Sequence, residues 1–102
     1  MRLRISPCVP ADLEEIVDFI AQDSPRHASR VLRELREQIT EIAKQPQNYR
    51  LRPEIGAEAR LATVGNYVIL FRIHQHAVRI ERVLHGSRDL PSVLEETESY
   101  RR

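Results

Sequence analysis

Residues 64–86 read VGNYVILFRIHQHAVRIERVLHG and predict a set of tightly connected strands. The glycine-containing pair at 65–66 is typical of a tight hairpin. The run 67–73 is almost continuously apolar and β-branched or aromatic, which indicates a central strand covered on both faces for much of its length. A second turn is expected around 75–77, before a last strand that Gly86 closes. Strands joined by tight turns run antiparallel, so we expect a curved antiparallel sheet.

The chain before this sheet predicts one strand and two helices. Residues 2–6 alternate polar and apolar side chains, as a half-buried strand does. Pro10 suits the first position of a helix that ends near Gln22, and Ser24 suits the N-cap of a longer helix that Pro46 ends. Each helix carries one apolar stripe. The stripes consist of Leu13, Ile16, Val17 and Ile20, and of Ala28, Val31, Leu32, Leu35, Ile39, Ile42 and Ala43.

The predicted order is therefore β-α-α-β-β-β with a short C-terminal helix, an α+β fold. Two helices separated by a short break, each with one stripe to bury, should form a hairpin packed on one face of the sheet. Residues 46–58 lack periodicity and are expected to be a loop. We expect a single domain over residues 1–96, and a flexible tail over 97–102 because those residues have little to bury.

Composition excludes several classes of protein. A chain of 102 residues with 41% hydrophobic and 30% charged residues has the balance of one globular domain with a modest core. No apolar run approaches the ~18 residues of a membrane span, and no signal-peptide block is visible. The single cysteine, Cys8, cannot form an internal disulfide and fits a reducing compartment. We expect a cytoplasmic protein without a membrane segment.

Metal, nucleophilic and cofactor chemistry find little support in the sequence. His74 and His76, with His85 nearby, lack the further ligands of a zinc site and fall where the hairpin should turn, so we expect no metal site. Cys8 is expected to be buried and inert. No glycine-rich phosphate loop and no Gly-x-Ser-x-Gly elbow occurs, so we expect no cofactor.

Arginines are the informative polar residues. Lys44 is the only lysine among 16 basic residues, a bias that marks either an interaction surface or a GC-rich coding sequence. Residues 50–90 contain seven basic and four acidic side chains, which favours an anionic partner there. The candidates for contact with a target are Arg50, Arg52, Arg60, Arg72, Arg82 and Arg88.

Two of these arginines fall in otherwise apolar registers. Alternation places Arg72 on the face of Val68 and Leu70, and gives Arg82 the parity of Val78 and Ile80. Because an unpaired buried guanidinium is costly, each either faces a partner at the open end of the sheet or pairs inward, with Glu81 or Asp89 as possible acids. Arg79 is expected to be a solvated strand residue.

The order of elements, together with several motifs, resembles the ParE/RelE superfamily of bacterial toxins over residues 1 to about 95. The ending VLHGSRDL, residues 83–90, looks more like the ParE branch. The other motifs that carry the resemblance are Asp12-Leu13-Glu14-Glu15-Ile16, Phe19-Ile20, Arg52-Pro53-Glu54, Val64-Gly65-Asn66-Tyr67 and Phe71-Arg72.

This resemblance implies a type II toxin–antitoxin module. A cognate antitoxin would hold the toxin inactive by wrapping its C-terminal segment over it, and the complex would contact operator DNA through the antitoxin. ParE members inhibit DNA gyrase by binding and are not enzymes, whereas RelE members cut mRNA on the ribosome. A family member that has lost toxicity and keeps only antitoxin binding is a further alternative.

Metal-free RNA cleavage needs groups that accept and donate protons, and arginine stays charged. RelE-like toxins use lysines, arginines and a C-terminal tyrosine, whose position here falls at Leu94. Gyrase inhibition is therefore preferred. Ribosome-dependent mRNA cleavage is the alternative, and would use Arg60, Arg72, His85 and Arg88.

The two helices should leave apolar surface for the antitoxin, and the sheet should leave an edge. A disordered acidic tail could fold across the helical hairpin or add a strand. We expect a heteromeric toxin–antitoxin complex. The candidate antitoxin contacts are Leu13, Ile16, Ile20, Leu32, Leu35 and Ile39.

Overall fold

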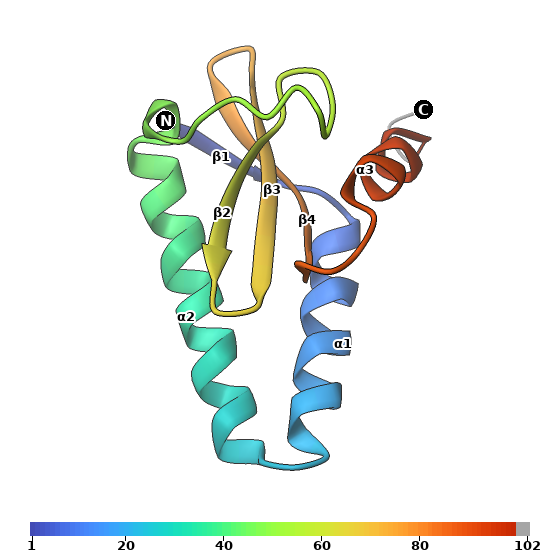
Figure 1. The fold of residues 1–102 in the computed structure, drawn as a ribbon. Helices are drawn as coiled ribbons and strands as arrows, with labels where there is room; N and C mark the ends of the chain where they lie inside the picture. The colour runs from blue at the N-terminus through green and yellow to red at the C-terminus, as the bar shows by residue number, and fades with distance from the viewer. Residues whose placement is uncertain (100–102) are drawn as a thin grey trace.

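The computed structural model describes residues 1–99 as two helices, a four-stranded sheet and a third helix (Figure 1). The chain runs β1 (Arg2–Ile5), α1 (Cys8–Ala21), α2 (Pro25–Lys44), a short 3-10 helix (Pro46–Asn48), β2 (Arg60–Val64), β3 (Tyr67–His74), β4 (Ala77–His85) and α3 (Leu90–Ser99). The predicted α+β fold and order of elements are confirmed. None of the described helices is long and apolar enough to cross a membrane.

The sheet has the strand order β1-β4-β3-β2. Strands β2, β3 and β4 are antiparallel, as their tight turns require. Strand β1 is an exception to the expected antiparallel sheet, because it pairs with β4 in parallel, with Arg2 opposite Ala77 and Ile5 opposite Ile80. The whole helical hairpin separates β1 from β4 in the chain, so no tight turn constrains their direction. The side chains of β1 are exposed rather than alternately buried.

The two faces of the sheet support two separate apolar clusters. On one face, α1 and α2 pack against strand residues that include Ile69, Phe71 and Ile80. On the other face, Val68 and Leu70 pack against α3 and the loop before β2. The central strand β3 is therefore covered on both faces, as its sequence predicted.

Helix ends follow local chemistry, with one difference from expectation. Ser24 caps α2, because its hydroxyl accepts a hydrogen bond from the His27 backbone N–H at 3.1 Å. Helix α1 begins at Cys8, two residues before the predicted start at Pro10. The buried Ser6 explains the earlier start, since its hydroxyl accepts from the Cys8 N–H and its carbonyl from the Val9 N–H.

The C-terminal helix is longer than predicted. It continues through Ser99, whereas a tail was expected to begin at residue 97. Thr97 is buried, and its hydroxyl donates to the Val93 carbonyl at 2.8 Å, so this turn has more to bury than the sequence suggested. The rest of the predicted tail, residues 100–102, lies outside the described residues.

Candidate functional site

Three arginines of the sheet are paired with acids. The Arg72 Nη2 donates to Glu98 of α3 at 2.6 Å. The Arg79 Nε lies 2.7 Å from Oε1 of Glu81, whose side chain is fully buried. Arg79 is therefore not the plain solvated residue that its position suggested. Arg82 pairs with Asp12 and not with Glu81 or Asp89.

The Asp12–Arg82 pair joins two helices, α1 and α3, to the strand β4. Asp12, 5% exposed on α1, accepts 2.8 Å hydrogen bonds from Nε and Nη2 of Arg82. Asp12 also accepts a hydrogen bond from the Val83 backbone N–H at 3.0 Å. Val83 lies beyond Ile80, the last residue of β4 that pairs with β1. Nη1 of Arg82 reaches Thr97 of α3 at 3.4 Å. The hydrogen bonds to Asp12 raise the pKa of the Arg82 guanidinium, which therefore stays protonated. We call the Asp12–Arg82 pair the clamp.

A bulge in β4 explains why the predicted parity of Arg82 is wrong. Leu70 lies opposite Arg82 whereas Phe71 lies opposite Ile80, so Glu81 is an extra residue in β4. Beyond the bulge, Val83 joins the cluster under the helical hairpin, on the same face as Ile80. Arg82 therefore no longer shares a face with Ile80.

The other candidate arginines divide between structural and exposed positions. Nη1 of Arg60 donates to the Gln47 and Tyr49 carbonyls, which ties β2 to the segment after α2. Arg52 makes a 2.8 Å ion pair with Glu54, and this hydrogen bond lowers the pKa of the Glu54 carboxyl. Arg50 and Arg88 are exposed. Arg60, Arg72 and Arg82 therefore hold the fold together, whereas the exposed Arg50 and Arg88 make no such side-chain bond within residues 1–99.

His85 and Arg88 line a pocket of about 290 Å³ at the end of β4. The His85 Nδ1 accepts the Ser87 backbone N–H at 3.1 Å, and the ring meets Tyr67 edge-on with centroids 5.6 Å apart. Neither Arg60 nor Arg72 lines this pocket, so the four candidate catalytic residues are not gathered at one place. The pocket, referred to below as the β4-end pocket, is also lined by Asp12, Glu15, Ile16, Phe19, Tyr67, Val83 and Leu84.

Sequence reasoning missed several residues of these sites. Phe19 falls outside the apolar stripe of α1, and a large aromatic outside such a stripe is a signal of exposure that could have been used. It is 69% exposed. Asp12 and Glu98 gave no comparable signal, because their arginine partners are remote in sequence.

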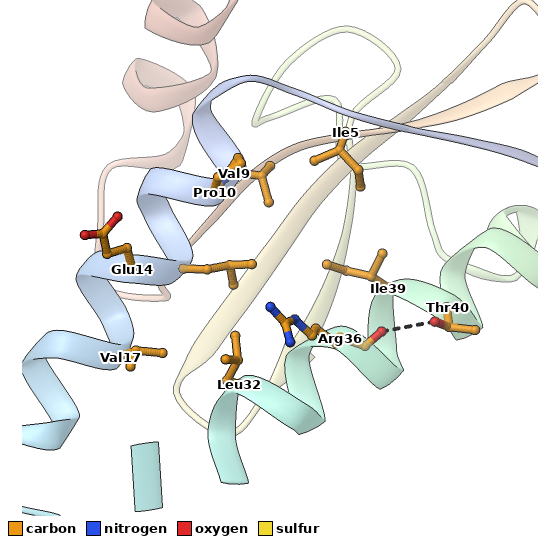
Figure 2. A pocket seen from close by; sticks show the side chains of 10 residues that line it. Ile5, Val9, Pro10, Glu14, Val17, Leu32, Arg36, Ile39 and Thr40 are labelled. Carbon is orange, nitrogen blue, oxygen red and sulfur yellow. Dashed lines mark hydrogen bonds between the residues drawn. The ribbon is translucent and has the colours of Figure 1, made fainter. Parts of the chain in front are cut away.

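A groove of about 590 Å³ runs between α1 and α2 beside β1 (Figure 2). Leu13 of α1 and Leu32 of α2 both line it. The Arg36 guanidinium reaches between the two helices. Exposed apolar side chains of the edge strand β1, Leu3 and Ile5, extend the same surface. We call this surface the hairpin groove; the rest of its lining consists of Val9, Pro10, Glu14, Val17, Ile39 and Thr40.

Only part of the predicted antitoxin contacts lies in the hairpin groove. Leu13 and Leu32 are half-buried there, and Ile39 lines the groove with little exposed surface. The other three residues, Ile16, Ile20 and Leu35, are buried in the cluster against the sheet. Helical periodicity identifies an apolar stripe, but it does not tell which edge of that stripe stays open.

The geometry offers no metal site within residues 1–99, where no group of three His, Cys, Asp or Glu side chains is arranged to hold an ion. His74 ends β3, and His76 lies in the following turn with a φ of 61°. Cys8 is half-buried at the start of α1.

Comparisons with known proteins agree with this architecture. Residues 3–90 match the family model described as ParE toxin of type II toxin-antitoxin system, parDE. The chain belongs to the ParE toxin family. The fold is similar to that of a solved structure described as a chromosomal ParDE TA system from P. aeruginosa, with a TM-score of 0.73 and 22% identity over 83% of this chain and 95% of that chain. A search of curated proteins gives no match for this ParE-family toxin.

Proposed function

We propose that this ParE-family toxin inhibits DNA gyrase by binding it, without catalysing a reaction. The observation that carries the proposal is that Arg60, Arg72 and Arg82 are bound to carbonyls or carboxylates of the same chain. Cleavage of RNA without a metal needs a proton acceptor, a proton donor and cations around the phosphate. Because arginine stays charged, none of these three arginines accepts or donates a proton at neutral pH, and Arg72 and Arg82 are already paired with carboxylates.

Ribosome-dependent mRNA cleavage is the second candidate. It is favoured by the exposed His85 and Arg88, which both line the β4-end pocket, since an imidazole can transfer a proton and an arginine can bind phosphate. The expected tyrosine position is instead Leu94, which is buried against the sheet.

A supercoiling assay on relaxed plasmid tests the first proposal. Purified toxin should inhibit gyrase or trap cleaved DNA, and preincubation with the antitoxin should reverse the effect. Unaffected supercoiling by folded toxin, with mRNA cut in a programmed-ribosome assay, would overturn the proposal in favour of the second candidate.

We infer that the cognate antitoxin neutralises the toxin by laying an acidic amphipathic segment in the hairpin groove and along β1. The groove offers apolar walls, and the exposed Arg36 in its lining can pair with an acidic side chain of the segment, while Glu14 is the one acid among the described lining residues. Strand β1 is one of the two edge strands of the described sheet and lies beside the groove, so its outer backbone groups can pair with an added strand. Operator DNA would then be contacted by the antitoxin, and the complex would act in the cytoplasm.

Leu32→Arg tests the groove, because an added cation would lie within its apolar wall. We expect at least a tenfold loss of antitoxin affinity, with gyrase inhibition unchanged. The matched control is Leu51→Arg, which changes an exposed leucine outside the groove. Equal antitoxin affinity of both variants would contradict the docking site.

A further inference from the structure

The β4-end pocket is separate from the proposed antitoxin site, although Asp12 and Val83 in its lining also hold the fold together. It forms where α1 passes the end of β4, and it uses residues of α1 that do not line the hairpin groove. Its walls are apolar, and Phe19 stands at the edge with 69% of its surface in water. An aromatic side chain left exposed beside an apolar hollow is a common feature of surfaces that bind a partner.

Two residues with hydrogen-bond donors, His85 and Arg88, line this pocket at and after the end of β4. The Ser87 backbone N–H can only donate, so Nδ1 of His85 is an acceptor and the ring proton of the neutral imidazole lies on Nε2. The Arg88 side chain has no acidic partner within residues 1–99, in contrast to Arg72, Arg79 and Arg82. A carboxylate can therefore be bound at this end of the pocket without displacing an existing ion pair.

The charges around the β4-end pocket favour a protein ligand over a nucleic acid. Asp12 is neutralised by Arg82, which leaves Glu15 and Arg88 as one negative and one positive charge among the lining residues. Asp18 adds a further exposed acid on α1. A polyanionic backbone would be repelled by this helix, whereas a protein segment with a single acidic group near an apolar side chain would fit.

We propose that the β4-end pocket binds a protein segment of the toxin's target, with an apolar or aromatic side chain against Phe19 and Tyr67 and an adjacent carboxylate on Arg88. The inference deepens the proposed function and rests on the toxin acting by binding. It makes Phe19 and Arg88 the centre of the target interface, on a surface separate from the hairpin groove.

The test compares Phe19→Ala and Arg88→Gln with two matched controls, Leu51→Ala and Arg26→Gln, which change exposed residues outside the pocket and outside the candidate target contacts. Each variant is assayed for gyrase inhibition, for antitoxin binding and for growth arrest when expressed without antitoxin. We expect the pocket variants to bind antitoxin like the unchanged toxin, which shows that they are folded. We expect them to lose at least tenfold in gyrase inhibition, with both controls unaffected.

Inhibition of gyrase by both pocket variants within twofold of the unchanged toxin would overturn the inference and leave the proposed function intact. If the unchanged toxin fails to inhibit gyrase, the growth assay separates the two proposals. Arrest by the unchanged toxin but not by Phe19→Ala would support the pocket with a different target protein. The inference would be overturned if the unchanged toxin and Phe19→Ala arrest growth equally, or if neither arrests growth. It would also be overturned if the toxin binds bare DNA or RNA and both Phe19→Ala and Arg88→Gln abolish that binding.

Discussion

The two faces of the sheet are built from different kinds of interaction. The face under α1 and α2 is an apolar cluster in which Phe71 and Leu35 have no exposed surface. The face under α3 also has an apolar cluster, but the arginines on and beside it are paired with acids of α1, β4 and α3. The first face provides hydrophobic stability, and the second fixes the position of α3 and of the β4 end.

Substitution of a large residue on the face of the sheet under α1 and α2, the hairpin face, should have the largest effect on stability. Phe71→Ala removes a buried ring that packs edge-on against Tyr49, with centroids 5.3 Å apart. We expect a loss of about 4 kcal/mol in the free energy of unfolding, measured by urea denaturation. Phe19→Ala makes the same change at an exposed position and should alter stability by less than about 0.5 kcal/mol. Similar losses for both would show that Phe71 is not part of the core.

Breaking the clamp between the two faces should have the next largest effect. Asp12→Ala leaves Arg82 and the Val83 N–H without their acceptor, and we expect a loss of about 3 kcal/mol, again by urea denaturation. Glu15→Ala, an exposed acid on the same helix, should cost less than about 0.5 kcal/mol.

The clamp also has a test that separates pairing from packing. Adding Arg82→Met to Asp12→Ala removes the buried charge, so the double variant should be more stable than Asp12→Ala alone. An equally unstable double variant would mean that the loss comes from the helix and not from an unpaired guanidinium.

Loss of the half-exposed ion pair between Arg72 and Glu98, on the face under α3, should have the smallest effect on stability. Glu98→Gln removes a pair in which the acid is 49% exposed, so we expect less than about 1 kcal/mol, decreasing as salt is added. The control is Glu54→Gln, for which we expect no measurable change at neutral pH. Because Arg52 lowers the pKa of Glu54, any contribution of that pair is present above the ordinary carboxyl pKa and is lost as pH falls through the lowered value. Unfolding midpoints across pH and salt check both statements.

Much of the hairpin face could be predicted from the sequence. Its stability depends on local periodicity, so the helical spacing of Ile16 and Ile20, and of Leu35 and Ile39, is enough to identify the apolar stripes that pack there. The family resemblance rested on the same regular pattern of elements, and residues 3–90 match that family.

The candidate site was harder to predict because its contacts join residues remote in sequence. Arg82 was recognisable as an arginine in an apolar register, but its partner Asp12 lies 70 residues away. The bulge at Glu81 reverses which face of the sheet the following side chains of β4 occupy, and no turn residue or glycine in the sequence indicates it. Periodicity therefore predicts which side chains are buried, whereas ion pairs between distant segments depend on the completed fold.

The parallel pairing of β1 with β4 has a consequence for how the toxin is made. Residues 2–5 cannot pair until residues 77–80 have been synthesised, and Asp12 cannot pair until Arg82 has been synthesised. The complete sheet and the Asp12–Arg82 clamp therefore form only after that point. Contacts of such high sequence separation make folding slow and leave it incomplete on a growing nascent chain. The β1 side of the hairpin groove and the β4-end pocket would then both be completed late in folding. With the roles proposed for these two surfaces, a newly synthesised chain would become able to bind its target and its antitoxin at a similar stage of folding.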